Sequence, residues 1–175
     1  MRIRTLTASD AIQYRELMLD AYTLAADAFT STPEERALEP ESWWVNRVAN
    51  PGGLTVSFAA EVGDSLVGTV ALEYSSKAKT KHSALLIGMY VREHVRGQGV
   101  GRSLLQEALR HASQRPHLQA VTLTVTEGNE PAIRMYRGAG FQTWGIQPLA
   151  IATPSGLLGK VHMSYRLAGY APSAA

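Results

Sequence analysis

The sequence contains no cysteine. This absence excludes disulfide bonds, thiolate metal sites and any mechanism that uses a cysteine nucleophile. Long apolar runs are also missing, because the longest, residues 84–91, is far shorter than the ~20 residues that span a bilayer. The first ten residues lack the apolar core of a secretory signal. We therefore expect a cytoplasmic protein that has no contact with membranes.

Charge of either sign is sparse, with 18% charged residues and a formal net charge of +2. No run of Lys and Arg interleaves with aromatic residues, so a nucleic-acid partner is not expected. Internal repeats and linker-like segments are absent too. The 175 residues suffice for one hydrophobic core. We predict a single domain over residues 1–167, followed by a C-terminal tail at residues 168–175.

Hydrophobic periodicity predicts a mixed α/β fold. The expected strands are residues 2–7, 54–61, 66–74, 82–91, 121–126, 141–151 and 160–167. The expected helices are residues 10–26, 43–50, 99–114 and 129–138, with Ser9 or Asp10, Ser42 and Asn129 as N-caps. Residues 29–42 suit a loop with at most one helical turn. The nearly continuous apolar run at 82–91 predicts a strand buried on both faces, parallel to the strand at 121–126.

Three glycines on alternate positions, Gly97, Gly99 and Gly101, separate that apolar run from an amphipathic helix pattern. Glycines let backbone N–H groups approach a ligand closely and permit positive φ angles. The N-terminus of the following helix adds a positive dipole end, and Arg96 and Arg102 add charge. This pattern predicts a turn that binds the phosphate groups of a ligand.

The spacing of the glycines differs from that of two better-known phosphate-binding motifs. A dinucleotide fingerprint needs G-x-G-x-x-G, but the third glycine comes one residue early. A P-loop needs Gly-Lys-Ser/Thr after a longer loop, whereas this chain has Gly101-Arg102-Ser103. On spacing alone, a glycine-rich turn without any ligand remains an alternative.

Two segments together resemble the GCN5-related N-acetyltransferases, the GNAT family. Residues 96–101 (RGQGVG) match the family's R/Q-x-x-G-x-G/A motif, and residues 129–141 (NEPAIRMYRGAGF) match N-x-x-A-x-x-L-Y-x-x-x-G-F. The resemblance covers about residues 1–167. One departure is Glu93, which stands where the family commonly has proline.

The resemblance implies a single-domain GNAT fold: a mixed, mostly antiparallel sheet with a splayed parallel pair formed by the fourth and fifth strands, flanked by helices. It implies acetyl-CoA as co-substrate and no metal. Backbone groups of Met89, Tyr90 and Val91 would pair with the pantetheine arm, and Asn129 would hydrogen-bond it. The amides that would hold the pyrophosphate belong to Arg96, Gly97, Gln98, Gly99, Val100, Gly101, Arg102 and Ser103.

Without cysteine, the expected chemistry is direct attack of a primary amine on the acetyl carbonyl. The resemblance places Tyr136 near the thioester sulfur as the catalytic proton donor, and a backbone N–H near Tyr90 or Val91 at the oxyanion. The identity of the general base stays open. Ser83 stands about where histone-type relatives carry a glutamate, and Glu73, His82 and Glu127 are the candidate substitutes, although each could equally be a solvated side chain at a strand end.

The sequence gives the least information about the molecule that accepts the acetyl group. Residues 27–41 carry five carboxylates against Arg36, which could attract a cationic amine or simply form a solvated face. Trp43 and Trp44 should point in different directions on a helix, one into the core and the other toward a pocket or a dimer contact. Small molecules and proteins both remain open as acceptors.

Two other functions remain as alternatives. One is a non-catalytic acyl-CoA-binding module, and the other is a nicotinamide-dependent oxidoreductase. A homodimer built on the last hairpin is a further expectation.

Overall fold

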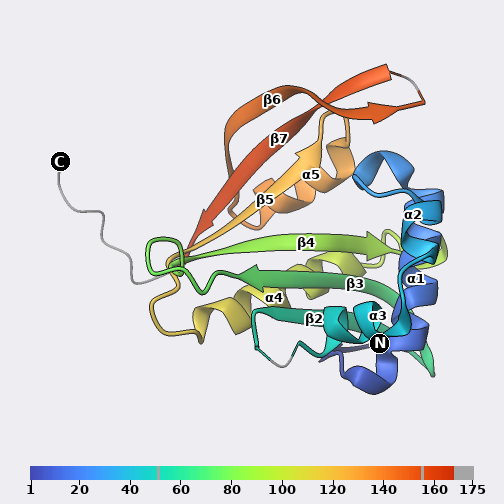
Figure 1. The fold of residues 1–175 in the computed structure, drawn as a ribbon. Helices are drawn as coiled ribbons and strands as arrows, with labels where there is room; N and C mark the ends of the chain where they lie inside the picture. Colours follow the sequence, from blue (N-terminus) through green and yellow to red (C-terminus); the bar gives the residue numbers. More distant parts are fainter. Residues whose placement is uncertain (51, 155, 168–175) are drawn as a thin grey trace, which may run out of the picture.

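A seven-stranded sheet forms the centre of the molecule in the computed structural model (Figure 1). The structure describes residues 1–50, 52–154 and 156–167; the predicted tail lies outside this range. The strands are β1 (Arg2–Thr5), β2 (Thr55–Val62), β3 (Ser65–Tyr74), β4 (Ser83–Val91), β5 (Ala120–Thr126), β6 (Gln142–Thr153) and β7 (Gly156–Arg166). Their order across the sheet is β1-β2-β3-β4-β5-β7-β6. Only β4 and β5 pair in parallel within the described chain, which confirms the predicted fold class.

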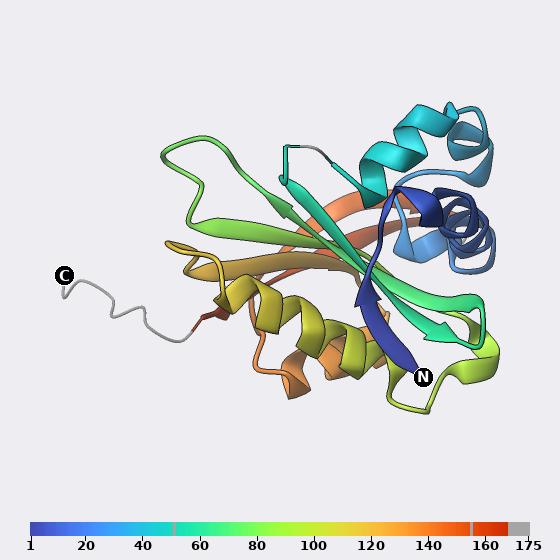
Figure 2. The ribbon, with the colours of Figure 1, turned by 90° about the horizontal axis from the view of Figure 1, so that it is seen from below.

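Helices cover both faces of this sheet (Figure 2). They are α1 (Ala11–Leu24), α2 (Pro33–Ala37), α3 (Glu41–Val48), α4 (Val100–Ser113) and α5 (Glu130–Gly138), with short 3-10 turns η1 (Ala8–Asp10), η2 (Ala26–Ala28) and η3 (Glu93–Val95). Residues of α4 and α5 form the main core with one face. Residues of α1 and α3 form a second core on the other face. No helix among the described residues is both long and apolar enough to cross a membrane.

Local sequence signals explain where the helices begin, with small shifts from prediction. Thr7 and Asp10 form a capping box that opens η1. Asp10 is then the N-cap residue of α1, so of the two predicted caps the structure has Asp10 rather than Ser9. Thr32 and Glu35 form another that opens the single-turn helix α2. The second predicted helix, α3, starts after Pro40, two residues earlier than expected, since the fixed φ of proline suits the residue at a helix entry.

The prediction that β4 is buried on both faces is wrong. Alternate residues Ala84 and Leu86 enter the core, but Leu85 is 38% exposed, and Ile87 and Met89 are only half-buried. Leu85 and Ile87 border the cleft described below, and Met89, beyond an irregularity in the strand, borders the same cleft while it packs against the main core. An apolar run therefore served here to line a cleft as well as to fill a core.

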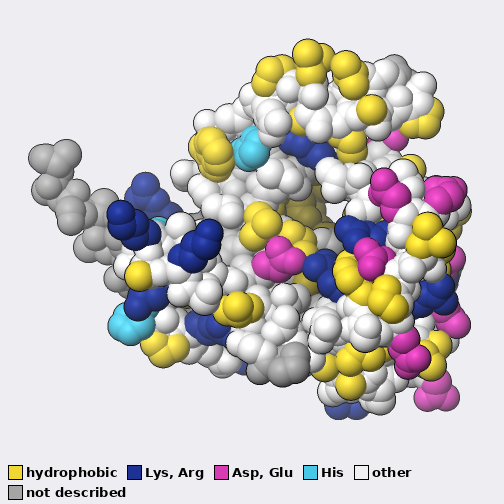
Figure 3. All heavy atoms as spheres, in the orientation of Figure 1, with side chains coloured by type: hydrophobic (Ala, Val, Ile, Leu, Met, Phe, Trp, Pro, Cys, Tyr) yellow, Lys and Arg dark blue, Asp and Glu magenta, His cyan; other side chains and the backbone are white. Residues whose placement is uncertain are grey.

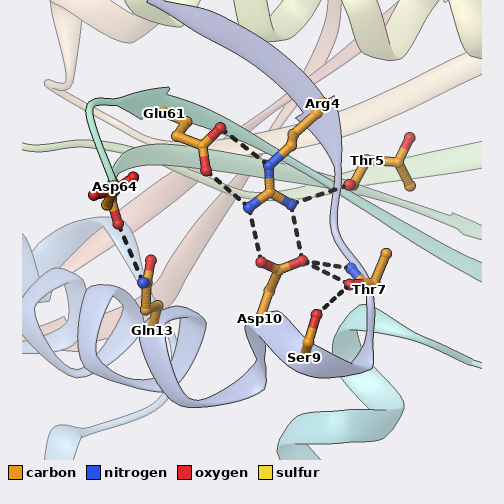
Figure 4. A network of polar contacts seen from close by, with 8 residues as sticks. All are labelled: Arg4, Thr5, Thr7, Ser9, Asp10, Gln13, Glu61 and Asp64. Carbon is orange, nitrogen blue, oxygen red and sulfur yellow. Dashed lines mark hydrogen bonds and ion pairs between the residues drawn. The ribbon is translucent and has the colours of Figure 1, made fainter.

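An ion-pair network fastens the start of the chain to the sheet and to α1 (Figure 4). The guanidinium of Arg4 donates to both carboxylate oxygens of Asp10 at 2.8 Å and also binds Glu61 on β2. The hydrogen bonds from Arg4 lower the pKa of Asp10 to about 2. Because α1 forms one wall of the cleft described below, this network helps to fix the position of that wall.

We expect Asp10→Asn to lower the free energy of unfolding at pH 7 by about 1 to 2 kcal/mol, after allowing for solvent screening. The folded-state pKa lies below the unfolded value of about 3.9, so the contribution is complete above that pH and disappears as the pH falls toward 2. Urea denaturation from pH 7 down to pH 3 would measure it. The control Glu107→Gln removes an exposed pair with Arg110 and should cost at most about 0.5 kcal/mol. Equal losses in both variants would contradict a special role for Asp10.

Candidate active site

The β4–β5 pair opens into a cleft partway along its length. Ladder partners run from Ser83 to Leu85 on β4, and the strands then diverge. Beyond that point Gly88 has a φ of +64°, and the register between β4 and β3 shifts by one residue, which is a β-bulge. The bulge turns β4 away from its parallel neighbour. A cleft of about 410 Å³ results.

Segments from both halves of the chain build the walls of this cleft. Residues of β4, β5 and α5 line one end, and residues of α1, α2, α3 and β3 line the other. Lys160 of β7 also lines it. Figure 3 shows the hollow between the β6–β7 hairpin and the helices, with basic side chains on both sides of it. The site therefore exists only once the two halves have packed together.

The glycine turn lies at the entrance to α4 and is exposed to solvent. Gly97 and Gly99 have φ angles of +77° and +81°, and Gly99 is the N-cap of α4, which supports the predicted anion-binding backbone. Gly101 has another role: a Cβ there would lie 3.0 Å from the sulfur of Met135 on α5. Its missing side chain therefore allows α4 to approach α5 closely, rather than making room for a ligand.

Arg96 turns back onto the strand that precedes the turn. Its Nε donates to the carbonyl of Val91 at 2.9 Å, and its guanidinium lies 5.9 Å from the ring centroid of Tyr90. The side chain thus holds the turn against the end of β4. Arg102 is exposed at the start of α4.

Asn129 and Tyr136 both face the cleft from α5. The Asn129 side chain caps the helix, accepting from the N–H of Ala132 at 3.3 Å, as predicted. Tyr136 is 5% exposed and packs edge-on against Phe141. Burial raises the pKa of the Tyr136 phenol, so the hydroxyl stays protonated throughout the neutral pH range. The two residues of the second motif are therefore brought to the same cavity.

Of the open general-base candidates, the structure brings Glu73 into the cleft, where it pairs with Arg47 at 2.9 Å. Ser83 and Glu127 line other surface depressions, and His82 is exposed before β4 begins. Within the described residues no cluster of His, Asp and Glu could hold a metal ion.

The acidic segment 27–41 does not turn its carboxylates into the cleft, so of the two alternatives left open by the sequence the structure favours the solvated face. Glu35 is used in the cap of α2, and Glu39 pairs with Arg36 at 3.3 Å. The charged side chain of this segment that lines the cleft is Arg36. The charge that this segment contributes to the cleft is thus positive, because its carboxylates face solvent, cap α2 or pair with Arg36.

The adjacent tryptophans diverge as expected. Trp44 is 1% exposed and packs against Tyr14 in the second core. The ring centroid of Trp43 lies 4.6 Å from the guanidinium carbon of Arg36 and 5.4 Å from that of Arg47. It therefore positions both arginines beside the cleft.

Lys160 is the cleft residue that sequence reasoning missed. It is 7% exposed, and its Nζ donates to Thr126 Oγ1 at 2.8 Å across the β5–β7 ladder. Burial lowers the pKa of this lysine. The alternation of residues 160–164 places Lys160 on the polar face of its strand with His162, but nothing in the sequence shows that this face closes over a cleft.

Comparison with known proteins agrees with this geometry. A family model described as "Acetyltransferase (GNAT) family" matches residues 16–141. YwnH of Bacillus subtilis, provisionally named a phosphinothricin acetyltransferase, is 30% identical over 131 residues, covering 71% of this chain and 72% of that protein. The L-amino acid N-acetyltransferase AaaT of Escherichia coli is 28% identical over 102 residues, covering 58% of this chain and 62% of that protein, less than two thirds.

The fold is also that of solved acetyltransferases. A phosphinothricin acetyltransferase from Sinorhizobium meliloti, solved in complex with acetyl-CoA, superposes with a TM-score of 0.82 at 17% identity, covering 95% of this chain and 88% of that one. The chain belongs to the GNAT family and is an N-acetyltransferase.

We expect Asn129→Ala to lower the free energy of unfolding by about 1 kcal/mol, because the N–H of Ala132 loses its cap. Asn129→Asp keeps an acceptor at the cap and should retain most of the stability. Asn46→Ala, inside α3, is the control and should be nearly neutral, since alanine favours a helix interior. Chemical denaturation of the three variants measures this, and a neutral Asn129→Ala would show that the cap contributes nothing.

Proposed function

We propose that this protein transfers the acetyl group of acetyl-CoA directly to the primary amine of a small molecule. The observation that carries the proposal is the open edge of β4. The β4–β5 ladder ends at Leu85, so the β5-facing backbone of residues 86–91 has no strand partner on that side in the described chain. An extended amide-containing chain such as pantetheine suits that edge, since it can complete the interrupted ladder.

The phosphate end of acetyl-CoA would then reach the start of α4. Backbone amides of residues 97–102 lie at the positive end of that helix, next to the exposed turn, whereas the amides of Arg96 and Ser103 already donate to the carbonyls of Glu93 and Gly99. Met89 and Asn129 line the cleft between this turn and Tyr136, along the path that the pantetheine arm would follow. The cofactor roles of residues 89–91, 96–103 and Asn129 therefore remain our proposal for this site.

The chemistry needs a neutral amine, a stabilised oxyanion and a stabilised thiolate. Glu73 is the carboxylate placed to accept a proton from the incoming ammonium, directly or through water. The backbone N–H of Tyr90 or Val91 would stabilise the oxyanion, and Tyr136 would hydrogen-bond the departing sulfur. Because a thiol has a pKa near 8.5, below that of the buried phenol, Tyr136 would donate a hydrogen bond rather than transfer its proton completely.

A small-molecule acceptor has the support of two observations. The cleft is partly closed by the segment between α1 and α2 on one side and by β7 on the other, which favours a compact substrate over a polypeptide. YwnH and AaaT carry the names of enzymes that act on phosphinothricin and L-amino acids. Acetylation of peptides but not of small amines would argue for a protein acceptor.

Acetyl-CoA at saturating concentration should raise the melting temperature, because a ligand selective for the folded state stabilises it, whereas NAD should not. CoA release with a panel of small primary amines, followed by a thiol reagent, tests the transfer itself. An absence of stabilisation by acetyl-CoA would overturn the proposed cofactor site.

Gly99→Ala should weaken acetyl-CoA binding at least about tenfold, because alanine at a φ of +81° distorts the amides at the start of α4. Gly63→Ala is a matched control: Gly63 has a φ of +59° in the β2–β3 turn and also has open space around its Cβ position. Both variants should lose about 1 kcal/mol of stability from backbone strain. Titration calorimetry with CoA should show weak binding only for Gly99→Ala. Equal CoA affinity in both variants would contradict a phosphate site here.

Tyr136→Phe should lower kcat about tenfold or more, with little change in the KM for acetyl-CoA, because the departing sulfur loses a hydrogen bond. Tyr165→Phe is the control, since Tyr165 contacts the same Phe141 ring but lies outside the cleft lining. Steady-state kinetics of both variants with the best amine of the panel measures the difference. An unchanged kcat in Tyr136→Phe would remove this residue from the mechanism.

A further inference from the structure

The cleft carries more positive than negative charge. The described charged side chains that line it are Arg36, Arg47, Glu73 and Lys160. Arg47 and Glu73 already form a pair at 2.9 Å. In addition to that ion pair, two cationic side chains therefore line the cleft, Arg36 from α2 and Lys160 from β7.

Lys160 is a buried ammonium with no carboxylate partner. Its Nζ donates one hydrogen bond, to Thr126 Oγ1, and no carboxylate of the described residues lies within 4.0 Å of it. The Thr126 hydroxyl is itself committed as a donor to the carbonyl of Asp27, so it can only accept from Lys160. A lysine ammonium has three N–H donors, and two of them remain for a ligand. Such a group is costly to bury unless an anion joins it.

Arg36 also lines the cleft, and one N–H of its guanidinium is buried without a partner among the described residues. Its Nη1 binds Glu39 and its Nη2 binds Ser31, while the buried Nε has no hydrogen-bond partner within the described chain. Stacking on Trp43 restricts the plane of the guanidinium. The unpaired N–H is thus held in a defined direction and would be satisfied by an acceptor oxygen.

One segment of the chain positions both cations. The carbonyl of Asp27 in η2 orients Thr126 and, through it, Lys160, and Ser31 a few residues later binds Arg36. The same segment packs against β5 and β6, as Figure 1 shows for the chain between α1 and α2. The two donors therefore belong to one assembled surface at the cleft wall.

We propose that the acceptor carries an oxyanion beside its amine, as an α-amino acid does, and that Lys160 with Arg36 binds this group. The inference rests on the proposed acetyl transfer and specifies its substrate class. An oxyanion at this position would accept from the two open donors of Lys160 and lie in the positive field of the Arg36 guanidinium, while the amine of the same molecule faces Glu73. Lys160 is then a residue that determines specificity for the acceptor.

Matched pairs of amines test this directly, each pair being an L-amino acid and its carboxamide. The wild-type enzyme should show a kcat/KM at least about 100-fold higher for the acid of the preferred pair, because charge-assisted hydrogen bonds discriminate strongly. Lys160→Met should lower kcat/KM for the acid about 10- to 100-fold more than kcat/KM for the amide. Arg36→Met should act in the same direction.

Lys81→Met, an exposed lysine before β4, is the control and should preserve the preference. Because Lys160→Met replaces an unpaired buried cation with an apolar chain of similar length, its melting temperature should equal or exceed that of the wild type. If that variant fails to fold, Lys160→Gln allows the same comparison.

Each outcome bears on a different part of the inference. Equal rates for acids and amides in the wild type would overturn the oxyanion site while leaving the acetyltransferase activity intact. Equal losses for acid and amide in Lys160→Met would also overturn it, since Lys160 would then act on the reacting carbonyl. No CoA release with any amine or peptide would contradict the proposed function itself.

Discussion

The interrupted pairing between β4 and β5 is the constraint on which the rest of this structure depends. Two parallel strands that stayed paired along their full length would leave neither a cleft nor an open backbone edge. The ladder ends at Leu85, and the bulge at Gly88 turns the strand away from its neighbour. α4 and α5 still pack beneath both strands, so the divergence does not break the core. One irregularity thus supplies both the cavity and the free hydrogen-bonding groups.

Side chains near this opening are placed by contacts that also stabilise the fold. Arg96 holds the glycine turn against β4, and Asn129 caps α5 while facing the cleft. Trp43 contacts two arginines with its ring. The Thr126 hydroxyl donates to a carbonyl of η2 and accepts from Lys160. Lys160 is the exception, because a buried ammonium without a carboxylate opposes stability. Groups that violate the ordinary rules of burial in this way are expected at functional sites.

Short stretches of sequence predicted much of the fold and the residues proposed to bind the cofactor. Local patterns placed every strand and every helix of more than one turn within a few residues, because capping boxes, glycines and periodicity act over neighbouring positions. The two motifs at residues 96–101 and 129–141 indicated the family. The acceptor side was not predictable in the same way. The carboxylates of residues 27–41 looked available, yet the fold uses Glu35 in a cap and Glu39 in a pair with Arg36.

By itself the sequence determined the order of elements, the glycine turn and the family, since each depends on residues adjacent in the chain. It misjudged β4, because an apolar run does not show whether another layer of the structure will cover each face of the strand. Only the tertiary structure decided which charges meet: Glu73, Arg47, Arg36 and Lys160 come from four elements and converge on one cleft. Charge and burial in that cleft arise from strand divergence and helix packing between distant segments, and no local pattern encodes them.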